Sequence, residues 1–397
     1  KRGEIKKLLV LESLPKPVNF SGGMDLVSWT GTFTLERVLG TVPVEEDGSA
    51  FFEVPANRQI FFVALDEKDL SVKRMHSWCN AMPGESVGCV GCHEQRVEAP
   101  QTRAQHGKLL AVSKPPSKIE PFAGFPDVMD FNRDVQPILN KHCVKCHDHT
   151  KREGKLILAG DFGPQWSHSY FSLFAHRQVA DGANGLGNRP PRSVGSSASP
   201  LMKKIDGSHH DAKVSPQEWR TIWLWIESGA PYTGTYAGLR NTQQQHSNGA
   251  ASGSVLGGKR ALIRRRCGSC HEEQQGDEDT GFKPLPYTAE LVRKHKKKLT
   301  RQAGQHERIV IEDDPIGRLS PTILLNFTRP ELSPLILGPL AKSAGGFGTC
   351  GDVFKDKNDP DYKELLDALV RSKPLYEAGQ TFGSPTFKPN QQYIREM

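Results

Sequence analysis

The sequence predicts a mixed fold, in which an N-terminal β-rich, sandwich-like domain is followed by mainly α domains. Three observations predict it. Short apolar stretches of strand type lie within the first 85 of the 397 residues, two capped amphipathic helices are expected further along, and one cysteine–histidine motif occurs three times. This length is typical of two or three domains.

The β-rich domain is expected at residues 1–98 and ends in the first copy of the motif. Phe33–Glu36 and Phe52–Val54 alternate apolar and polar residues with period two, as half-buried strands do. Ile60–Leu65 is a short apolar run that suits a buried strand. Residues 99–129 are rich in Pro, Lys and Ser, which predicts a linker.

Residues 130–240 predict a helical domain bounded by two helices. We expect the first helix to have Asp134 as its N-cap and to run into the second copy of the motif. Ser215 and Glu218 form a capping box that begins the second helix, and Gly229 ends it. Its apolar face consists of Trp219, Ile222, Trp223 and Ile226.

Residues 259–397 predict another domain of the same plan, after a flexible linker at 241–258 that is rich in Gln, Asn, Ser and Gly. A Ser-Pro-Leu sequence precedes the closing helix in both domains, at Ser199 and at Ser333. Asp359 is expected to cap the later closing helix. We interpret the similarity as an internal duplication. The apolar face of that later helix is Tyr362, Leu365, Leu366 and Leu369.

The repeated motif is Cys-x-x-Cys-His, the attachment signature of c-type haem. Two thiols three positions apart reach the two vinyl groups of one porphyrin, and the following His lies under the iron as an axial ligand. We therefore expect three haem c groups, and we expect both helical domains to be cytochrome c-type haem domains. The cysteines are Cys89, Cys92, Cys143, Cys146, Cys267 and Cys270, and the iron ligands are His93, His147 and His271.

Other cysteine sites explain the motif less well. Zinc could be held by the second motif together with His149, but an adjacent Cys and His seldom bind one tetrahedral ion. A thioredoxin-like redox pair needs a strand-to-helix context and would not recur three times. Disulfides give no reason for a His after each pair of cysteines.

The sixth ligand of each iron decides whether a haem transfers electrons or binds a small molecule. For the second haem we favour His209, with His210 as the alternate, because this pair lies in a loop before the closing helix. For the third haem, His306, a thiolate from Cys350 and an open site remain alternatives. Cys350 could instead form a disulfide with Cys79. Candidates near the first motif are His76, Met82 and His106.

Charge and hydropathy restrict the partners. The formal net charge is +7, and only Arg293–Lys298 concentrates basic residues, so we expect no nucleic-acid partner. No run of about 18 apolar residues occurs, so we expect no integral membrane segment. Covalent haem attachment normally takes place outside the cytoplasm, so we expect a periplasmic or extracellular protein. The chain begins at Lys1 without an export signal, which indicates a processed or truncated N-terminus.

Part of the sequence resembles a known family, the hydrazine synthase alpha subunit and its bacterial relatives. Gly40–Pro55, Pro83–Glu85 and Cys89–Glu94 resemble the middle domain of that subunit. Asp134–Leu139, together with the capped helix from Ser215, resembles the cytochrome domain that follows it. The resemblance covers about residues 25–236 and leaves the third motif outside.

The resemblance implies haem ligands for the first two motifs. In the family, a tyrosine four residues after the first motif His binds the iron, and the motif His turns to zinc. Val97 occupies the tyrosine position here, so we expect His93 to ligate iron in the ordinary way. The second haem of the family has two His ligands, which fits His147 with His209 or His210.

These observations predict an exported triheme c-type cytochrome that performs electron transfer with a redox partner protein or with other haem subunits. One alternative is a redox enzyme in which an open-coordinate haem acts on a small nitrogen or oxygen compound, as in hydrazine synthase. Another is a structural haem-wired subunit of a multi-subunit assembly or a homo-oligomer. The sequence assigns no catalytic residue.

Overall fold

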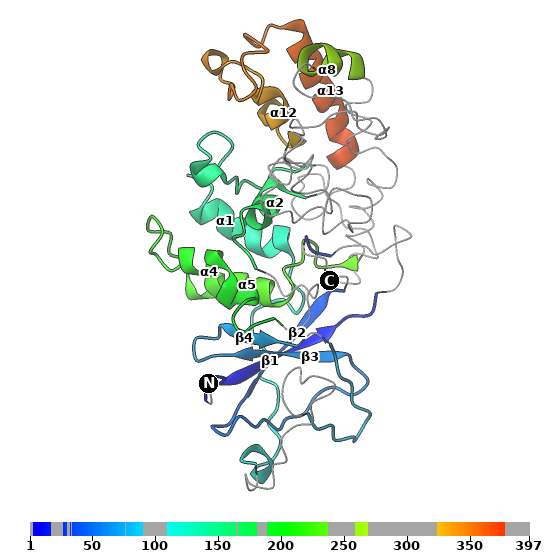
Figure 1. Ribbon diagram of the computed structural model, residues 1–397. Coiled ribbons are helices and arrows are strands. Elements are labelled where there is room, and N and C mark those ends of the chain that lie inside the picture. Colours follow the sequence, from blue (N-terminus) through cyan, green and yellow to red (C-terminus); the bar gives the residue numbers. More distant parts are fainter. Residues whose placement is uncertain are drawn as a thin grey trace. The chain divides into compact units, whose positions relative to one another are not determined.

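The computed structural model divides into two compact units (Figure 1). The described residues are 3–16, 27–29, 32, 34–75, 77–89, 109–163, 166–180, 189–236, 259–268 and 324–377. The first unit comprises Lys1–Val18, Gly31–Val135 and Arg177–Gly234, and the second comprises Asn19–Thr30, Gln136–His176 and Thr235–Met397. Residues of the domain expected at 130–240 fall in both units, and the expected domain boundaries stay predictions.

The first unit contains an antiparallel sheet of four strands in the order β2-β1-β3-β4. The strands are β1 (Lys7–Ser13), β2 (Glu36–Pro43), β3 (Ile60–Leu65) and β4 (Ser71–Arg74). In β1, Leu9, Val10 and Leu11 are completely buried, and the strand pairs with a neighbour along each edge. The apolar centre of β1 therefore forms the middle of this sheet.

The β-rich N-terminal region is confirmed, with corrections to its details. The buried strand expected at Ile60–Leu65 is β3. The strand expected at Phe33–Glu36 is β2, which begins only at Glu36, and Phe52 makes an isolated bridge to Ser117. Within the described residues the strands form one sheet rather than two facing sheets, so the sandwich is not confirmed.

Gly40 marks a close approach of two backbones at the edge of the sheet. A bulge shifts the β1–β2 register between Val10 and Leu11, and Gly40 has a φ of +136°. A Cβ atom at Gly40 would lie 2.1 Å from the carbonyl oxygen of Glu120. Thr41 and Glu120 exchange backbone hydrogen bonds of 2.9 Å, so this approach belongs to the sheet and favours glycine.

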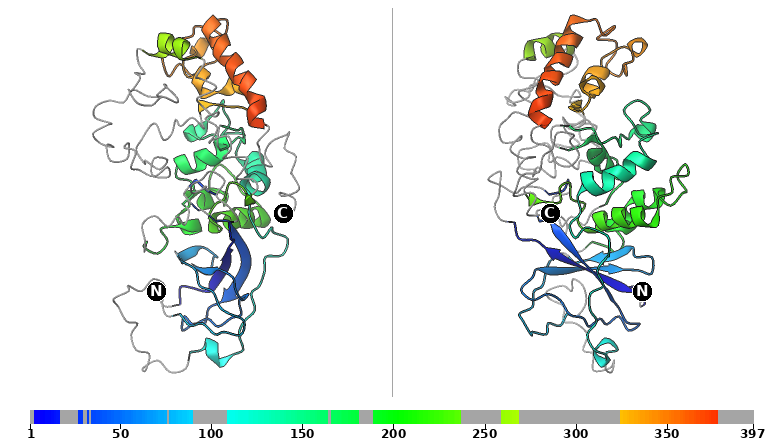
Figure 2. Two further views of the ribbon diagram at one scale, coloured as in Figure 1. Left: turned by 90° about the vertical axis from the view of Figure 1, so that its right-hand side faces the viewer. Right: turned by 180° about the vertical axis from the view of Figure 1, so that it is seen from behind.

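In the first unit, α4 (Pro200–Lys204) and α5 (Pro216–Glu227) lie on one side of the sheet (Figure 2). The predicted closing helix is confirmed as α5, with the capping box of Ser215 and Glu218 formed in both directions. Buried Arg74 of β4 donates to the carbonyl of Glu227 and forms an ion pair with Glu36 of β2, so it ties the end of α5 to two strands. The other helical elements are η2 (Ala111–Ser113), η3 (Phe131–Val135), α3 (Gly195–Ala198) and α4 (Pro200–Lys204).

The helix that leads to the second motif begins earlier than expected. Asp134 lies inside η3, a π-helical turn that continues directly into α1 (Gln136–His142). Asp130 is the residue at the start: its carboxylate accepts the backbone N–H of Arg133 at 3.0 Å. Asp134 accepts the backbone N–H of Asp130 at 2.7 Å. The two acids thus cap the turn reciprocally, and the N-cap expected at Asp134 is corrected to Asp130.

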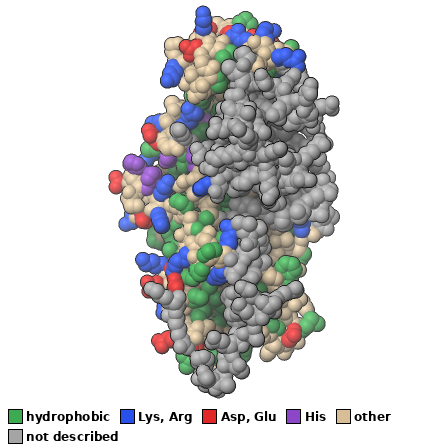
Figure 3. Space-filling model, in the orientation of Figure 1, with side chains coloured by type: hydrophobic (Ala, Val, Ile, Leu, Met, Phe, Trp, Pro, Cys, Tyr) green, Lys and Arg blue, Asp and Glu red, His purple; other side chains and the backbone are tan. Residues whose placement is uncertain are grey.

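The second unit is mainly helical in its described part. Asp359 caps α13 as predicted, because its carboxylate accepts the N–H of Asp361 at 2.8 Å. Tyr362, Leu365 and Leu369 of α13 are buried in a core that α8 and α12 share. Both basic and acidic side chains are exposed on this part of the surface (Figure 3). The helical elements are α1, η4 (Glu153–Lys155), α2 (His168–Ala175), α8 (Arg260–Cys267), η6 (Pro330–Leu332), α12 (Pro334–Leu337), η7 (Lys342–Ala344) and α13 (Pro360–Glu377).

Both Ser-Pro-Leu sequences begin a short helix in the same way. Ser199 is the N-cap residue of α4 and Ser333 is that of α12, and a proline occupies the first helical position in each. A helix also ends at the first cysteine of the third motif, as α1 ends just before the second motif. Among the described helices, none is long and apolar enough to cross a membrane.

Candidate haem-binding site

The second motif is described completely, and it forms a helical turn at the end of α1. The N–H of Cys143 donates to the carbonyl of Leu139 at 2.9 Å, and the N–H of His147 donates to that of Cys143 at 3.1 Å. The sulfur atoms of Cys143 and Cys146 are free thiols, and both residues are half-buried. The turn therefore presents two thiols and a histidine in the order that haem c attachment requires.

A backbone carbonyl orients the ring of His147. Nδ1 of His147 lies 2.8 Å from the carbonyl oxygen of Glu153, and the N–H of Glu153 donates to Cys146 at 3.2 Å. A carbonyl oxygen only accepts, so Nδ1 carries a proton and donates to it. A metal-ligating histidine is typically held in this way. The sequence predicts His147 but gives no signal for Glu153, because its contribution is a backbone atom.

The thiols do not have the character of a redox pair. Burial is the main cause that raises the pKa of the Cys143 thiol to about 11, and the neighbouring Cys146 is the second cause. A reactive cysteine has a lowered pKa instead. The structure does not support a zinc site made of this motif and His149, because His149 is buried and its ring contacts His168 instead. Within the described residues no group of three or more His, Cys, Asp or Glu could hold a metal ion. The donor set of two unpaired thiols and one oriented imidazole fits a covalently attached haem.

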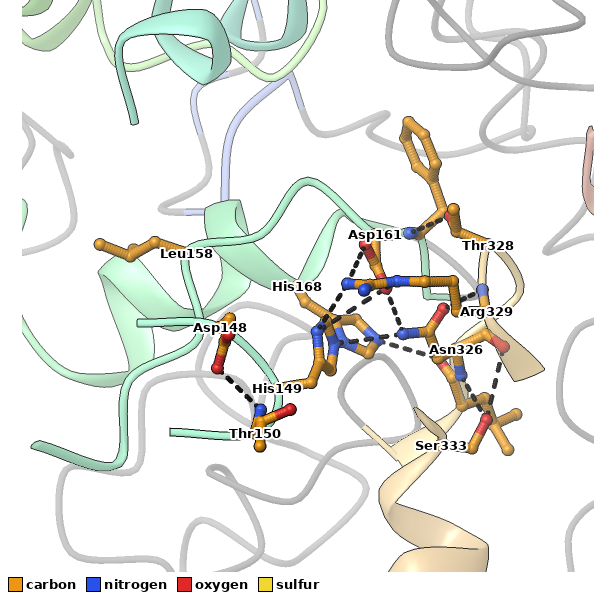
Figure 4. Close-up of polar contacts among 12 residues, drawn as sticks. Asp148, His149, Thr150, Leu158, Asp161, His168, Asn326, Thr328, Arg329 and Ser333 are labelled. Atoms are coloured by element: carbon orange, nitrogen blue, oxygen red, sulfur yellow. Dashed lines mark hydrogen bonds and ion pairs between the residues drawn. The ribbon is translucent and has the colours of Figure 1, made fainter. Parts of the chain in front are cut away.

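Two residues after His147, the chain enters a buried polar cluster that the sequence analysis did not identify (Figure 4). Nε2 of His149 lies 2.8 Å from Nδ1 of His168, the first residue of α2. Nε2 of His168 lies 3.0 Å from the carbonyl oxygen of Leu325, and Asp161 receives hydrogen bonds from Asn326 at 2.6 Å and from Arg329 at 2.8 and 3.0 Å. We call these side chains the histidine cluster: His149, Asp161, His168, Asn326 and Arg329.

Burial and charge determine the protonation of the cluster. Burial, together with the neighbouring His168, lowers the pKa of His149 to about 3, so His149 is neutral near pH 7. Burial alone would raise the pKa of Asp161, but the hydrogen bonds from Arg329 and the charge of its neighbours outweigh burial and lower it. Nη2 of Arg329 lies 3.2 Å from Nδ1 of His149, and the amide nitrogen of Asn326 lies 3.1 Å from Nε2, so nitrogen donors face both ring nitrogens of His149.

The predicted sixth ligands of the second haem lie in the first unit. His209 and His210 occupy the loop between α4 and α5, as expected, and their rings are in edge-to-face contact with centroids 4.7 Å apart. His210 has a φ of +48°, in the left-handed region. His147 belongs to the second unit, so ligation by His209 or His210 stays a prediction.

The first and third motifs are described only in part. Cys89 is exposed at the end of a described range, and Cys267 is the last residue of α8. Cys350 is exposed, and its N–H donates to the carbonyl of Gly338 at 3.2 Å. Cys79 and Cys350 lie in different units, so their pairing is not tested. Met82 is 62% exposed in the described part. The predicted residues outside the described ranges are His76, Cys92, His93, His106, Cys270, His271 and His306.

Comparison with known proteins agrees with the resemblance seen in the sequence. Residues 3–94 match the family model of the hydrazine synthase alpha subunit middle domain. A solved structure, the Kuenenia stuttgartiensis hydrazine synthase, matches with a TM-score of 0.41 and 18% identity, over 59% of this chain and 40% of that chain. The present chain thus spans less than half the length of that solved chain. No curated protein matches the sequence. The chain is similar to the hydrazine synthase alpha subunit, and the match in its N-terminal region is to the middle domain of that subunit.

Proposed function

We propose that this chain is a multihaem c-type subunit of a redox enzyme of the hydrazine synthase kind. The observation that carries the proposal is the second motif, where two unpaired thiols and a histidine held through Nδ1 are arranged on one turn. The match to a middle domain of the hydrazine synthase alpha subunit supports the enzyme over an independent electron carrier. The reaction would act on a small nitrogen or oxygen compound.

Three haem c groups are part of the proposal. The six motif cysteines would hold them through thioethers, and His93, His147 and His271 would each supply one axial ligand. A bound haem supplies one-electron chemistry, and it also binds a small molecule where its sixth position is open. The chain itself orients His147 through the carbonyl of Glu153 and leaves the thiols of Cys143 and Cys146 half-buried.

The proposal has consequences for compartment and partners. Covalent haem attachment places maturation outside the cytoplasm, so we propose a periplasmic or extracellular location. Similarity to a subunit supports assembly with other chains, which would include the electron donor or acceptor. The second candidate function is an electron carrier, which Val97 favours because an aliphatic residue stands where the family has an iron-binding tyrosine.

The test begins with haem content. The chain would be produced in a host that matures c-type cytochromes, and covalent haem would be counted by mass spectrometry and by the pyridine haemochrome spectrum. We expect three haems in the wild type, two in the Cys143→Ala/Cys146→Ala variant and three in a Cys79→Ala control. A chain without covalent haem would contradict the proposal.

Carbon monoxide then separates the two candidate functions. We expect part of the Soret absorbance of the dithionite-reduced protein to shift on adding CO, because an enzyme of this kind needs an open iron. An unchanged spectrum would mean that every iron is six-coordinate and would favour the electron carrier. Light scattering of the purified protein with its co-purifying chains tests the assembly.

A further inference from the structure

One segment, residues 325–329, links residues that follow the second motif to the core around the third, and we call it the bridge segment. Its apolar and polar side chains have different partners. Leu325 and Phe327 are buried in the core that includes α8, against which Cys267 of the third motif packs. Asn326 and Arg329 belong to the histidine cluster and reach residues that follow the second motif.

Backbone hydrogen bonds fix the bridge segment in place. The N–H of Phe327 donates to the carbonyl of Phe162 at 2.8 Å, and the N–H of Phe162 donates to Oγ1 of Thr328 at 3.0 Å. Next to Phe162, the carboxylate of Asp161 receives two hydrogen bonds from the guanidinium of Arg329. The planar fork of arginine makes this contact directional, which an ammonium group would not do.

A second contact reaches the same loop from another side. The guanidinium of Arg152 lies over the ring of Phe347, 3.6 Å from its centroid. Phe347 packs against the core of α8, α12 and α13. Arg152 directly precedes Glu153, whose carbonyl oxygen holds Nδ1 of His147. The loop from His147 to Glu153 is therefore contacted at both ends by the part of the chain that surrounds the third motif.

We propose that Arg329 and Phe347 are positioning residues for the second haem, through which the third-motif region holds the loop that orients His147. Arg329 acts on His149 and Asp161, and Phe347 acts on Arg152. The ring orientation of His147 affects the iron, so the reduction equilibrium of the second haem depends on these contacts. This inference rests on the proposed haem attachment at Cys143 and Cys146.

The experiment compares two conservative variants with matched controls. Arg329→Lys keeps the charge and removes the planar fork, and Phe347→Leu keeps an apolar side chain and removes the ring beneath Arg152. Arg371→Lys is the control for the first, because Arg371 forms an exposed pair with Asp367 at 2.6 Å on α13. Phe122→Leu is the control for the second, because Phe122 lies beneath Arg220 in the first unit.

The readout is a redox titration of each holoprotein, followed by visible absorption and by electron paramagnetic resonance of the ferric haems. The component that disappears in Cys143→Ala/Cys146→Ala belongs to the second haem. We expect Arg329→Lys and Phe347→Leu each to change the reduction equilibrium constant of that component at least threefold and to alter its ferric signal. The other components and both control variants should stay within the threefold limit.

Two results would overturn the inference, and they are distinguishable. If covalent haem is present and the second-haem component is unchanged in both variants, or changes equally in the controls, the positioning role is wrong and the proposed function stands. If the wild type carries no covalent haem at Cys143 and Cys146, the proposed function fails and the inference fails with it.

Discussion

Replacing Arg329 by Gln should destabilise the protein more than replacing its partner Asp161 by Asn. The side chain of Asp161 is 9% exposed, whereas that of Arg329 is 44% exposed. Removing Arg329 leaves a buried carboxylate that keeps the amide of Asn326, at 2.6 Å, as its hydrogen-bond donor among the described residues, and a buried charge without its ion-pair partner costs about 3 kcal/mol or more. Removing the Asp161 charge leaves a guanidinium that can turn to water, which costs about 1 kcal/mol.

The difference between these two variants should depend on pH. In the wild type, the hydrogen bonds from Arg329 outweigh burial and lower the pKa of Asp161 below its unfolded value. The stability that the ionised carboxylate contributes is therefore complete at neutral pH and lost as the pH falls through the folded pKa. Without Arg329, burial dominates and raises the pKa of Asp161. The carboxyl group then takes up its proton earlier, so the deficit of Arg329→Gln should shrink on acidification.

Urea unfolding followed by circular dichroism at several pH values from 7 to 4 measures both effects. The control is Arg371→Gln, because its exposed pair with Asp367 should be worth about 0.5 kcal/mol or less. The reasoning is refuted if Asp161→Asn costs as much as Arg329→Gln at pH 7. It is equally refuted if the difference between them stays constant down to pH 4.

Three further predictions concern the first unit. Gly40→Ala would place a Cβ atom 2.1 Å from the Glu120 carbonyl oxygen, so it should lower the free energy of unfolding by about 2 kcal/mol or more and release the sheet edge, as hydrogen exchange would report. Ser215→Ala removes the acceptor for the Glu218 N–H and should cost about 1 kcal/mol in thermal unfolding. Burial raises the pKa of Asp130 to about 6, so its contribution to stability should fall as the pH rises from 4 to 6, and Asp130→Asn should abolish that slope in urea titrations.

Features that neighbouring residues determine were predictable from the sequence. Ser215 and Asp359 cap helices because their side chains reach backbone N–H groups two or three residues away. β3 was predictable because a short apolar run needs burial on both faces. The N-cap was misplaced at Asp134 because two acids four residues apart serve the same turn, and the pattern of residue types does not distinguish Asp130 from Asp134.

Contacts between distant residues account for what the sequence did not predict. Arg329 contacts His149 across 180 positions, and Asn326 contacts Asp161 across 165. No local pattern links such residues. Apolar and polar residues alternate from Leu325 to Thr328. This alternation does not indicate which carboxylate Arg329 meets, because that depends on how the chain folds back.

The position of His149 shows how the distant contacts decide the chemistry of the second motif. A histidine two residues after His147, near two thiols, satisfies the composition of a zinc site, and sequence alone leaves that alternative open. In the structure both ring nitrogens of His149 have other partners, since Nδ1 faces Arg329 and Nε2 faces His168. Burial and the neighbouring His168 also lower its pKa, which keeps the ring neutral within the cluster. The bridge segment and His168 therefore occupy His149. The donors that remain at the motif are two cysteines and His147, which is the set that a covalently bound haem requires.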